Sequence, residues 1–79
     1  MKEPRYVKVI WDDAASSATL EFEPSMHKPT VIETRGWVMQ EDKDGISVCS
    51  ERFEENGRKV YRGHTFIPRG MVQRVRKVR

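Results

Sequence analysis

Alternating apolar and polar residues predict that most of this chain is β-strand. In the first alternating segment, Val7, Val9 and Trp11 share one face of the expected strand. In the second, the alternation has Gly36 at its centre, and a glycine inside a strand predicts a bend or a bulge. The pattern is found in residues 6–11, 30–40, 46–53 and 60–67. We therefore expect four strands in these segments.

Turn-forming residues separate the last three of these strands. Residues 41–45, EDKDG, predict a turn that returns the chain into residues 46–53. In EENGRK, residues 54–59, Asn56 and Gly57 tolerate the positive φ values of a tight hairpin turn. The glutamates before this turn would then lie opposite the basic residues after it. Two consecutive hairpins follow from these two turns.

The connection between the first two strands is long and mixed. Residues 12–18 are small and polar and predict a turn or one helical turn, with an aspartate as its cap. Residues 20–23 predict a brief strand. Pro24 and Pro29 then enclose an extended loop, because each proline lacks an amide donor and disfavours helix in the residue before it.

The last segment, residues 71–79, permits two interpretations. Its apolar residues have helical spacing, which favours a short helix. Its length of nine residues, its three valines and the lack of a good N-cap favour a strand with a local bulge. Pro68 and Gly70 must break the preceding strand in either case. We favour the strand.

Five short strands in a meander predict an all-β fold: a small, strongly bent, five-stranded barrel of the SH3-like or Sm-like kind. With 79 residues and 37% hydrophobic residues, the chain has material for one domain, spanning residues 1–79. Closing the sheet into a barrel would also remove its exposed edges.

Charge is segregated along the chain. Residues 1–57 contain 7 Lys or Arg against 12 acidic residues, whereas residues 58–79 contain 8 Lys or Arg and no acidic residue. Such segregation is compatible with a basic face for phosphates. It is equally compatible with neutralisation between neighbouring strands, which would leave no such face.

Candidate chemistry is sparse. Cys49 is the only cysteine, so no intramolecular disulfide and no cysteine-rich metal site is expected. His27 and His64 belong to no metal signature, and no phosphate-binding glycine loop or nucleophile motif is present. We predict a protein that is not an enzyme and needs no metal or cofactor. Without a signal peptide or a membrane-length apolar run, a cytoplasmic location is expected.

Two motifs between residues 31 and 78 resemble those of the Sm and Sm-like proteins. The first is carried by Gly36, Val38, Asp42, Ile46 and Val48, and the second by Phe66, Ile67, Arg69, Gly70, Val72 and Val75. The resemblance implies a ring in which the fourth strand of one subunit pairs with the fifth strand of its neighbour. It also implies RNA contacts on two turns, at Lys43 and Asp44 and at Arg69 and Gly70. Ile67 and Pro68 further resemble the isoleucine-proline turn of SH3 domains.

A second resemblance covers nearly the whole chain. Small tailed-phage proteins of unknown role carry a W-x-D-A start, a G-W strand and an I-P-R-G ending. The matching residues here are Trp11, Asp13 and Ala14, then Gly36 to Met39, and finally Ile67 to Gly70. This resemblance implies a phage accessory protein in the host cytoplasm and no particular biochemical activity.

Two functions follow from these observations. The first is a non-enzymatic interaction module that binds a protein partner or a second copy of itself through outward-facing Trp37 and Met39. The alternative is a protein that binds RNA or another single-stranded nucleic acid through basic residues near its C-terminus. The candidate phosphate-binding residues are Lys43, Arg62, Arg69, Arg74, Arg76, Lys77 and Arg79. No membrane partner is expected.

Overall fold

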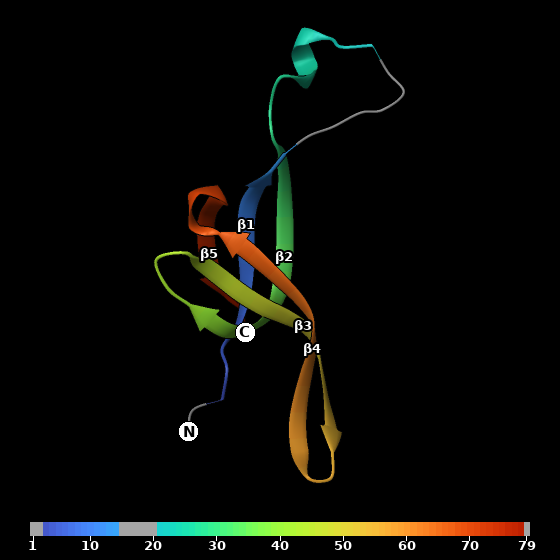
Figure 1. The fold of residues 1–79 in the computed structure, drawn as a ribbon, viewed down its shortest axis with the longest axis vertical. Coiled ribbons are helices and arrows are strands. Elements are labelled where there is room, and N and C mark those ends of the chain that lie inside the picture. The colour runs from blue at the N-terminus through green and yellow to red at the C-terminus, as the bar shows by residue number, and fades with distance from the viewer. Residues whose placement is uncertain (1–2, 15–20, 79) are drawn as a thin grey trace.

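A computed structural model describes residues 3–14 and 21–78 of the chain and contains one antiparallel sheet. The sheet is built from β1 (Tyr6–Asp13), β2 (Thr30–Glu41), β3 (Gly45–Glu55), β4 (Arg58–Pro68) and β5 (Val72–Lys77). The order of the strands across the sheet is β4-β3-β2-β1-β5 (Figure 1). The all-β fold and its five strands are confirmed. No helical segment in these residues is long and apolar enough to cross a membrane.

The last segment is a strand with a bulge, as predicted. β5 pairs with β1, and the register shifts between Ile10, which faces Arg74, and Trp11, which faces Val72. One residue of β5, Gln73, is therefore extra. The break predicted before this strand is the 3-10 helix η2 (Arg69–Met71), which carries the chain from β4 to the opposite edge of the sheet.

The connection between β1 and β2 differs from the prediction in three places. Asp12 and Asp13 do not begin a turn, because they continue β1 by pairing with Val31 and Thr30. The brief strand predicted for residues 20–23 is wrong for residues 21–23, which have no neighbouring strand to pair with. The loop between the two prolines contains the 3-10 helix η1 (Pro24–Met26), begun by Pro24. Residues 15–20 lie outside the described residues.

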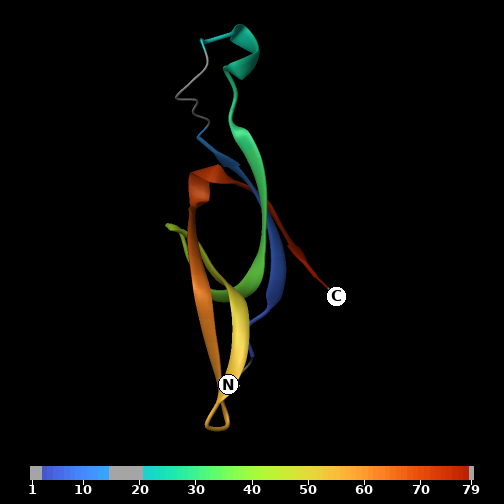
Figure 2. The same cartoon turned by 90° about the vertical axis from the view of Figure 1, so that its right-hand side faces the viewer.

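The sheet curls around a small core (Figure 2). Five side chains are almost completely inaccessible: Val7, Val9, Ile46, Val48 and Ile67. Trp11, Val38, Val72 and Val75 pack against them and are partly buried. Trp11 also donates a hydrogen bond from Nε1 to Oγ1 of Thr34 at 2.9 Å, which satisfies its one polar group.

The sheet is not closed into a complete barrel. The two strands at its ends, β4 and β5, are paired with β3 and β1 respectively and not with one another. Each therefore presents an edge of backbone amide and carbonyl groups. The expectation that closure would remove the edges is not met.

Gly36 allows β2 to approach β3 closely. A Cβ atom at this position would lie 2.7 Å from the carbonyl oxygen of Cys49 on β3 and 3.1 Å from Cβ of Val48. Only a residue without a side chain permits this approach of the two strands. A bulge follows directly, between Val38 and Gln40. A bend or a bulge was predicted at this glycine, and the structure has the bulge three residues further along, at Met39.

The β3–β4 hairpin extends well beyond the curled part of the sheet. β2 stops pairing with β3 at Trp37 and Cys49, whereas β3 and β4 remain paired to the end, at Glu55 and Arg58. Residues 50–63, which we call the projecting ribbon, thus have no third strand. In Figure 1 the ribbon and η1 lie at opposite ends of the long axis. The radius of gyration of 15.7 Å exceeds the roughly 12 Å expected of a compact chain of this length.

Replacing Gly36 by alanine is expected to lower the free energy of unfolding by about 1–3 kcal/mol, because the new methyl group overlaps the β3 backbone. Urea denaturation followed by tryptophan fluorescence measures the change. A loss of only a few tenths of a kcal/mol would show that the close approach of β2 and β3 is not required.

Replacing Gly57 by alanine is expected to cost about 1–2 kcal/mol for a different reason. Asn56 and Gly57 have φ values of 53° and 76°, as a type I′ turn requires, and nothing lies within 4 Å of the position of a Cβ at Gly57. The cost is therefore one of backbone conformation alone. Gly70 is the matched control, since its Cβ position is equally open and its φ is not positive. Gly70→Ala should leave the unfolding midpoint nearly unchanged.

Candidate interaction surfaces

An aromatic cluster holds the base of the projecting ribbon against the rest of the sheet. The rings of Tyr6 and Trp37 meet edge to face with centroids 4.6 Å apart, and Tyr61 of the ribbon lies 6.0 Å from Trp37. The guanidinium of Arg52 sits 4.8 Å from the centre of the Trp37 ring, a favourable cation–π distance. Lys59 donates a hydrogen bond to Glu3, which also lowers the pKa of that carboxyl. The ribbon is thus held by packing near its base and by one ion pair close to its turn.

The two strands of the projecting ribbon carry opposite charges. On β3, Glu54 and Glu55 face Lys59 and Arg58 of β4, as predicted from the turn. Closer to the base, Nε of Arg62 is 3.2 Å from Oε1 of Glu51. Arg62 also lies over the ring of Phe53, which remains 38% exposed. The edge of β3 in the ribbon is therefore mainly acidic and the edge of β4 is basic.

A second arrangement joins the β2–β3 turn to η2. Arg69 donates from Nη2 to the backbone oxygen of Asp42 at 2.8 Å and to Oε2 of Glu41 at 3.5 Å. Its backbone amide donates to the carbonyl of Asp44 at 3.0 Å. The other oxygen of Glu41 accepts a hydrogen bond from Arg5. The two turns that the Sm resemblance pairs are therefore adjacent, and the Arg69 guanidinium already has acceptors within the chain.

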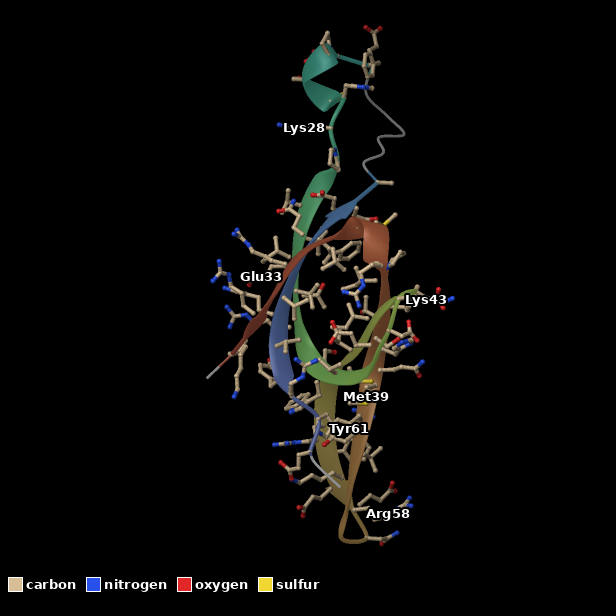
Figure 3. All side chains as sticks on the ribbon, turned by 90° about the vertical axis from the view of Figure 1, so that its left-hand side faces the viewer. Lys28, Glu33, Met39, Lys43, Arg58 and Tyr61 are labelled. Carbon is tan, nitrogen blue, oxygen red and sulfur yellow. The ribbon has the colours of Figure 1, made fainter. Side chains whose placement is uncertain are left out.

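Basic side chains gather on the outer face of β5, β1 and β2. Val7 and Val9 point into the core, so Lys8 points outward, and it faces Arg76 on β5 and Arg35 on β2. Arg74 lies two residues along β5, on the same face as Arg76. We call Lys8, Arg35, Arg74 and Arg76 the cationic face. Figure 3 shows nitrogen-tipped side chains on the side of the molecule where Glu33 lies.

The predicted phosphate-binding residues are distributed over three surfaces. Arg62 lies on the projecting ribbon and pairs with Glu51, while Arg69 and Lys43 lie at the two joined turns. In Figure 3, Lys43 is on the side of the molecule opposite Glu33. Arg74, Arg76 and Lys77 are exposed on β5, and none forms an ion pair with a residue that the structure describes. Arg79 lies outside the described residues.

The two residues predicted for a protein interface differ in their surroundings. Trp37 is half-buried and occupies the middle of the aromatic cluster at the ribbon base. Met39 is 38% exposed and sits at the bulge in β2. Met39 therefore has a larger exposed fraction than Trp37.

Lys8 and Arg35 were not among the candidates named from the sequence. The alternation already placed both on the polar face of their strands, next to Tyr6 and Trp37. What the sequence did not reveal is that β5 lies beside β1, which brings Arg74 and Arg76 next to these two residues.

No arrangement typical of a metal site is found in residues 3–14 and 21–78. These residues contain no group of three or more His, Cys, Asp or Glu side chains placed to hold a metal ion. His27 follows η1 and His64 lies on β4, two elements that do not pair. Cys49 is buried and free.

Comparison with known proteins adds no relative: no family model, no curated protein and no solved structure matches the chain.

Hydrogen bonds to its ionised form lower the pKa of Asp42 below the usual 3.8. The largest contribution is from the side chain of Gln40, followed by the amide of Asp44. A lowered pKa stabilises the fold above pH 3.8, and this contribution is lost as the pH falls through the folded-state pKa. Replacing Asp42 by asparagine should therefore destabilise the protein at neutral pH and progressively less below pH 3.8.

Denaturant unfolding at a series of pH values tests this pH dependence. Asp44→Asn is the control, because Asp44 contributes to the turn through its backbone amide and carbonyl. If the effect of the Asp42 replacement is the same at every pH, the carboxylate has no special role in the turn.

Proposed function

We propose that this protein is a non-enzymatic interaction module that associates with further copies of itself through the projecting ribbon. The observation that carries the proposal is that residues 50–63 form two paired strands, and no third strand of the described residues pairs with either of them. Strand edges of this kind bind further strands by completing their backbone hydrogen bonds. The I′-type turn and the aromatic cluster hold the ribbon in place before any partner binds.

Charge favours pairing between unlike edges of the ribbon. Two β4 edges would bring only basic residues together, and two β3 edges would bring Glu51, Glu54 and Glu55 together. An acidic β3 edge on one copy and the basic β4 edge of another attract one another. This contact is head to tail, so it generates a ring or an open chain of copies rather than a closed pair.

The arrangement implied by the Sm resemblance, β4 of one copy against β5 of the next, is less favourable here. Neither strand contains an acidic residue, while Arg62 lies on β4 and Arg74, Arg76 and Lys77 lie on β5. Like charges on facing strands are destabilising. The two edges of the ribbon, in contrast, carry opposite charges, acidic on β3 and basic on β4.

The association is expected to be modest and sensitive to salt. Each cross-strand charge pair contributes about 0.2–1 kcal/mol, and exposed pairs are screened as ionic strength rises. The backbone hydrogen bonds of about six residues on each edge add to this. The average molar mass of the protein in solution should therefore increase with protein concentration at low salt, and it should increase much less at high salt.

Exchanging the charges between the two ribbon strands tests the pairing rule. The variant Glu54→Lys, Glu55→Arg, Arg58→Glu, Lys59→Glu keeps opposite charges facing one another across the hairpin, and a fifth replacement, Glu3→Lys, keeps an opposite charge beside position 59. It is expected to associate with itself as the natural chain does. Mixed with the natural chain, it should not co-assemble, because both mixed junctions place like charges together.

Sedimentation velocity with one of the two proteins fluorescently labelled measures the co-assembly of the variant with the natural chain. Labelled natural chain in unlabelled natural chain is the reference for full co-assembly. Two results contradict the proposal: a monomer at every concentration in low salt, or a labelled variant that joins the natural chain as readily as it joins its own kind.

A further inference from the structure

The outer face of β5, β1 and β2 is arranged in rows that cross the strands. The central row is Arg76, Lys8 and Arg35, three cations in direct register on three neighbouring strands. With strands about 4.8 Å apart, the row is about 10 Å long. Arg74 extends it along β5, beside Ile10. A row of cations held on adjacent strands by backbone pairing is unfavourable unless something anionic offsets it.

The acidic residues on this face offset its charge only in part. Glu33 contacts two of the four cations, with oxygens 3.7 Å from Nζ of Lys8 and 3.3 Å from Nε of Arg35. Asp12, further along β1, accepts a hydrogen bond from Gln73 and has no ion pair with a described residue. Arg74 and Arg76 have no acidic partner in the part of the chain that the structure describes. Their guanidiniums remain free for a ligand.

Two aromatic residues lie next to the central row of cations, on the side away from Ile10 and Glu33. Tyr6 and Trp37 face one another on β1 and β2, two residues from Lys8 and Arg35 on the same face. Both rings are partly exposed, and Arg52 and Tyr61 fix the orientation of Trp37. Aromatic rings beside a basic strip are the two elements with which proteins bind single strands: stacking for a base and cations for the phosphates.

We propose that the cationic face binds single-stranded nucleic acid. The planar guanidiniums of Arg74 and Arg76 can each bind two oxygens of a phosphate, Lys8 and Arg35 add charge, and a base stacks beside the row on Tyr6. Contacts of this kind go to the backbone and to ring faces, so the binding is independent of sequence. The face is a sheet surface with no element that could enter a groove, which disfavours duplex DNA.

The four cations of this site are separate from both turns that the Sm resemblance assigns to RNA, and its aromatic residues contact the projecting ribbon through Arg52 and Tyr61 but are not part of the ribbon edges. Lys43 lies on the other side of the molecule from Glu33 (Figure 3), and the Arg69 guanidinium contacts Glu41 and Asp42. The proposal therefore does not depend on self-association. Nucleic-acid binding can fail while the ribbon pairs between copies, and self-association can fail while the cationic face binds nucleic acid.

Fluorescence anisotropy of labelled oligothymidylate and oligouridylate tests the proposal, with duplex DNA of equal length for comparison. Binding is expected to weaken steeply with salt. The double replacement Arg74→Ser, Arg76→Ser should weaken it and reduce the salt slope by about 1.4, or about 0.7 for each phosphate that is no longer neutralised. Lys28→Ser, Lys43→Ser is the matched control, because it removes the same charge from outside the face. Its affinity and slope should equal those of the natural chain.

Circular dichroism and thermal melting show whether each variant folds. If the β5 variant does not fold, Arg35→Ser on the central part of the sheet provides the same test with one cation removed, and a slope lower by about 0.7. Three results with the single strands would overturn the proposal: no binding at low salt, equal weakening in the face and control variants, or weakening confined to the control. The proposal would also fail if duplex DNA, or polyglutamate as an anionic polymer without bases, bound as tightly as the single strands.

Discussion

The close approach of β2 and β3 at Gly36 is the constraint on which the rest of the structure depends. In the described residues, no α-helix or second sheet covers the apolar face of the five-stranded sheet, so the sheet must curl on itself. The curl requires the β3 carbonyl at Cys49 to lie where a side chain would otherwise be. Among the described residues it encloses five almost completely buried side chains, and a core of this size leaves much of the length of β3 and β4 outside.

The projecting ribbon and the outer face of β5, β1 and β2 differ in how their charges are arranged. In the projecting ribbon, the acidic residues of β3 lie against the basic residues of β4, so the segregation along the sequence becomes neutralisation within one hairpin. On the outer face of β5, β1 and β2, the same segregation brings cations together, because the basic C-terminal strand lies beside a strand that carries Lys8. The two expectations formed from the sequence, a neutralised meander and a basic face, thus each apply to a different part of the molecule.

Local pattern was sufficient to predict what depends on neighbouring residues in the chain. The alternation around Val7 and Val9 and the Asn56–Gly57 turn indicated the strands, the hairpins and the inward faces. Three valines outweighed helical spacing in the last segment. Features that depend on long-range contacts could not be predicted from the sequence. These are the extension of β1 through Asp12 and Asp13, the open edges of β4 and β5, and the row of Arg76, Lys8 and Arg35 across three strands.

The most direct test of the central claim, that the ribbon edges left outside the core pair between copies, is backbone hydrogen exchange at increasing protein concentration. The account predicts that amides of residues 50–55 and 58–63 that are not bonded within the hairpin become protected as concentration rises at low salt, while amides between β1 and β2 do not change. New protection along β5, or a rise in mass with no new protection in the ribbon, would contradict it.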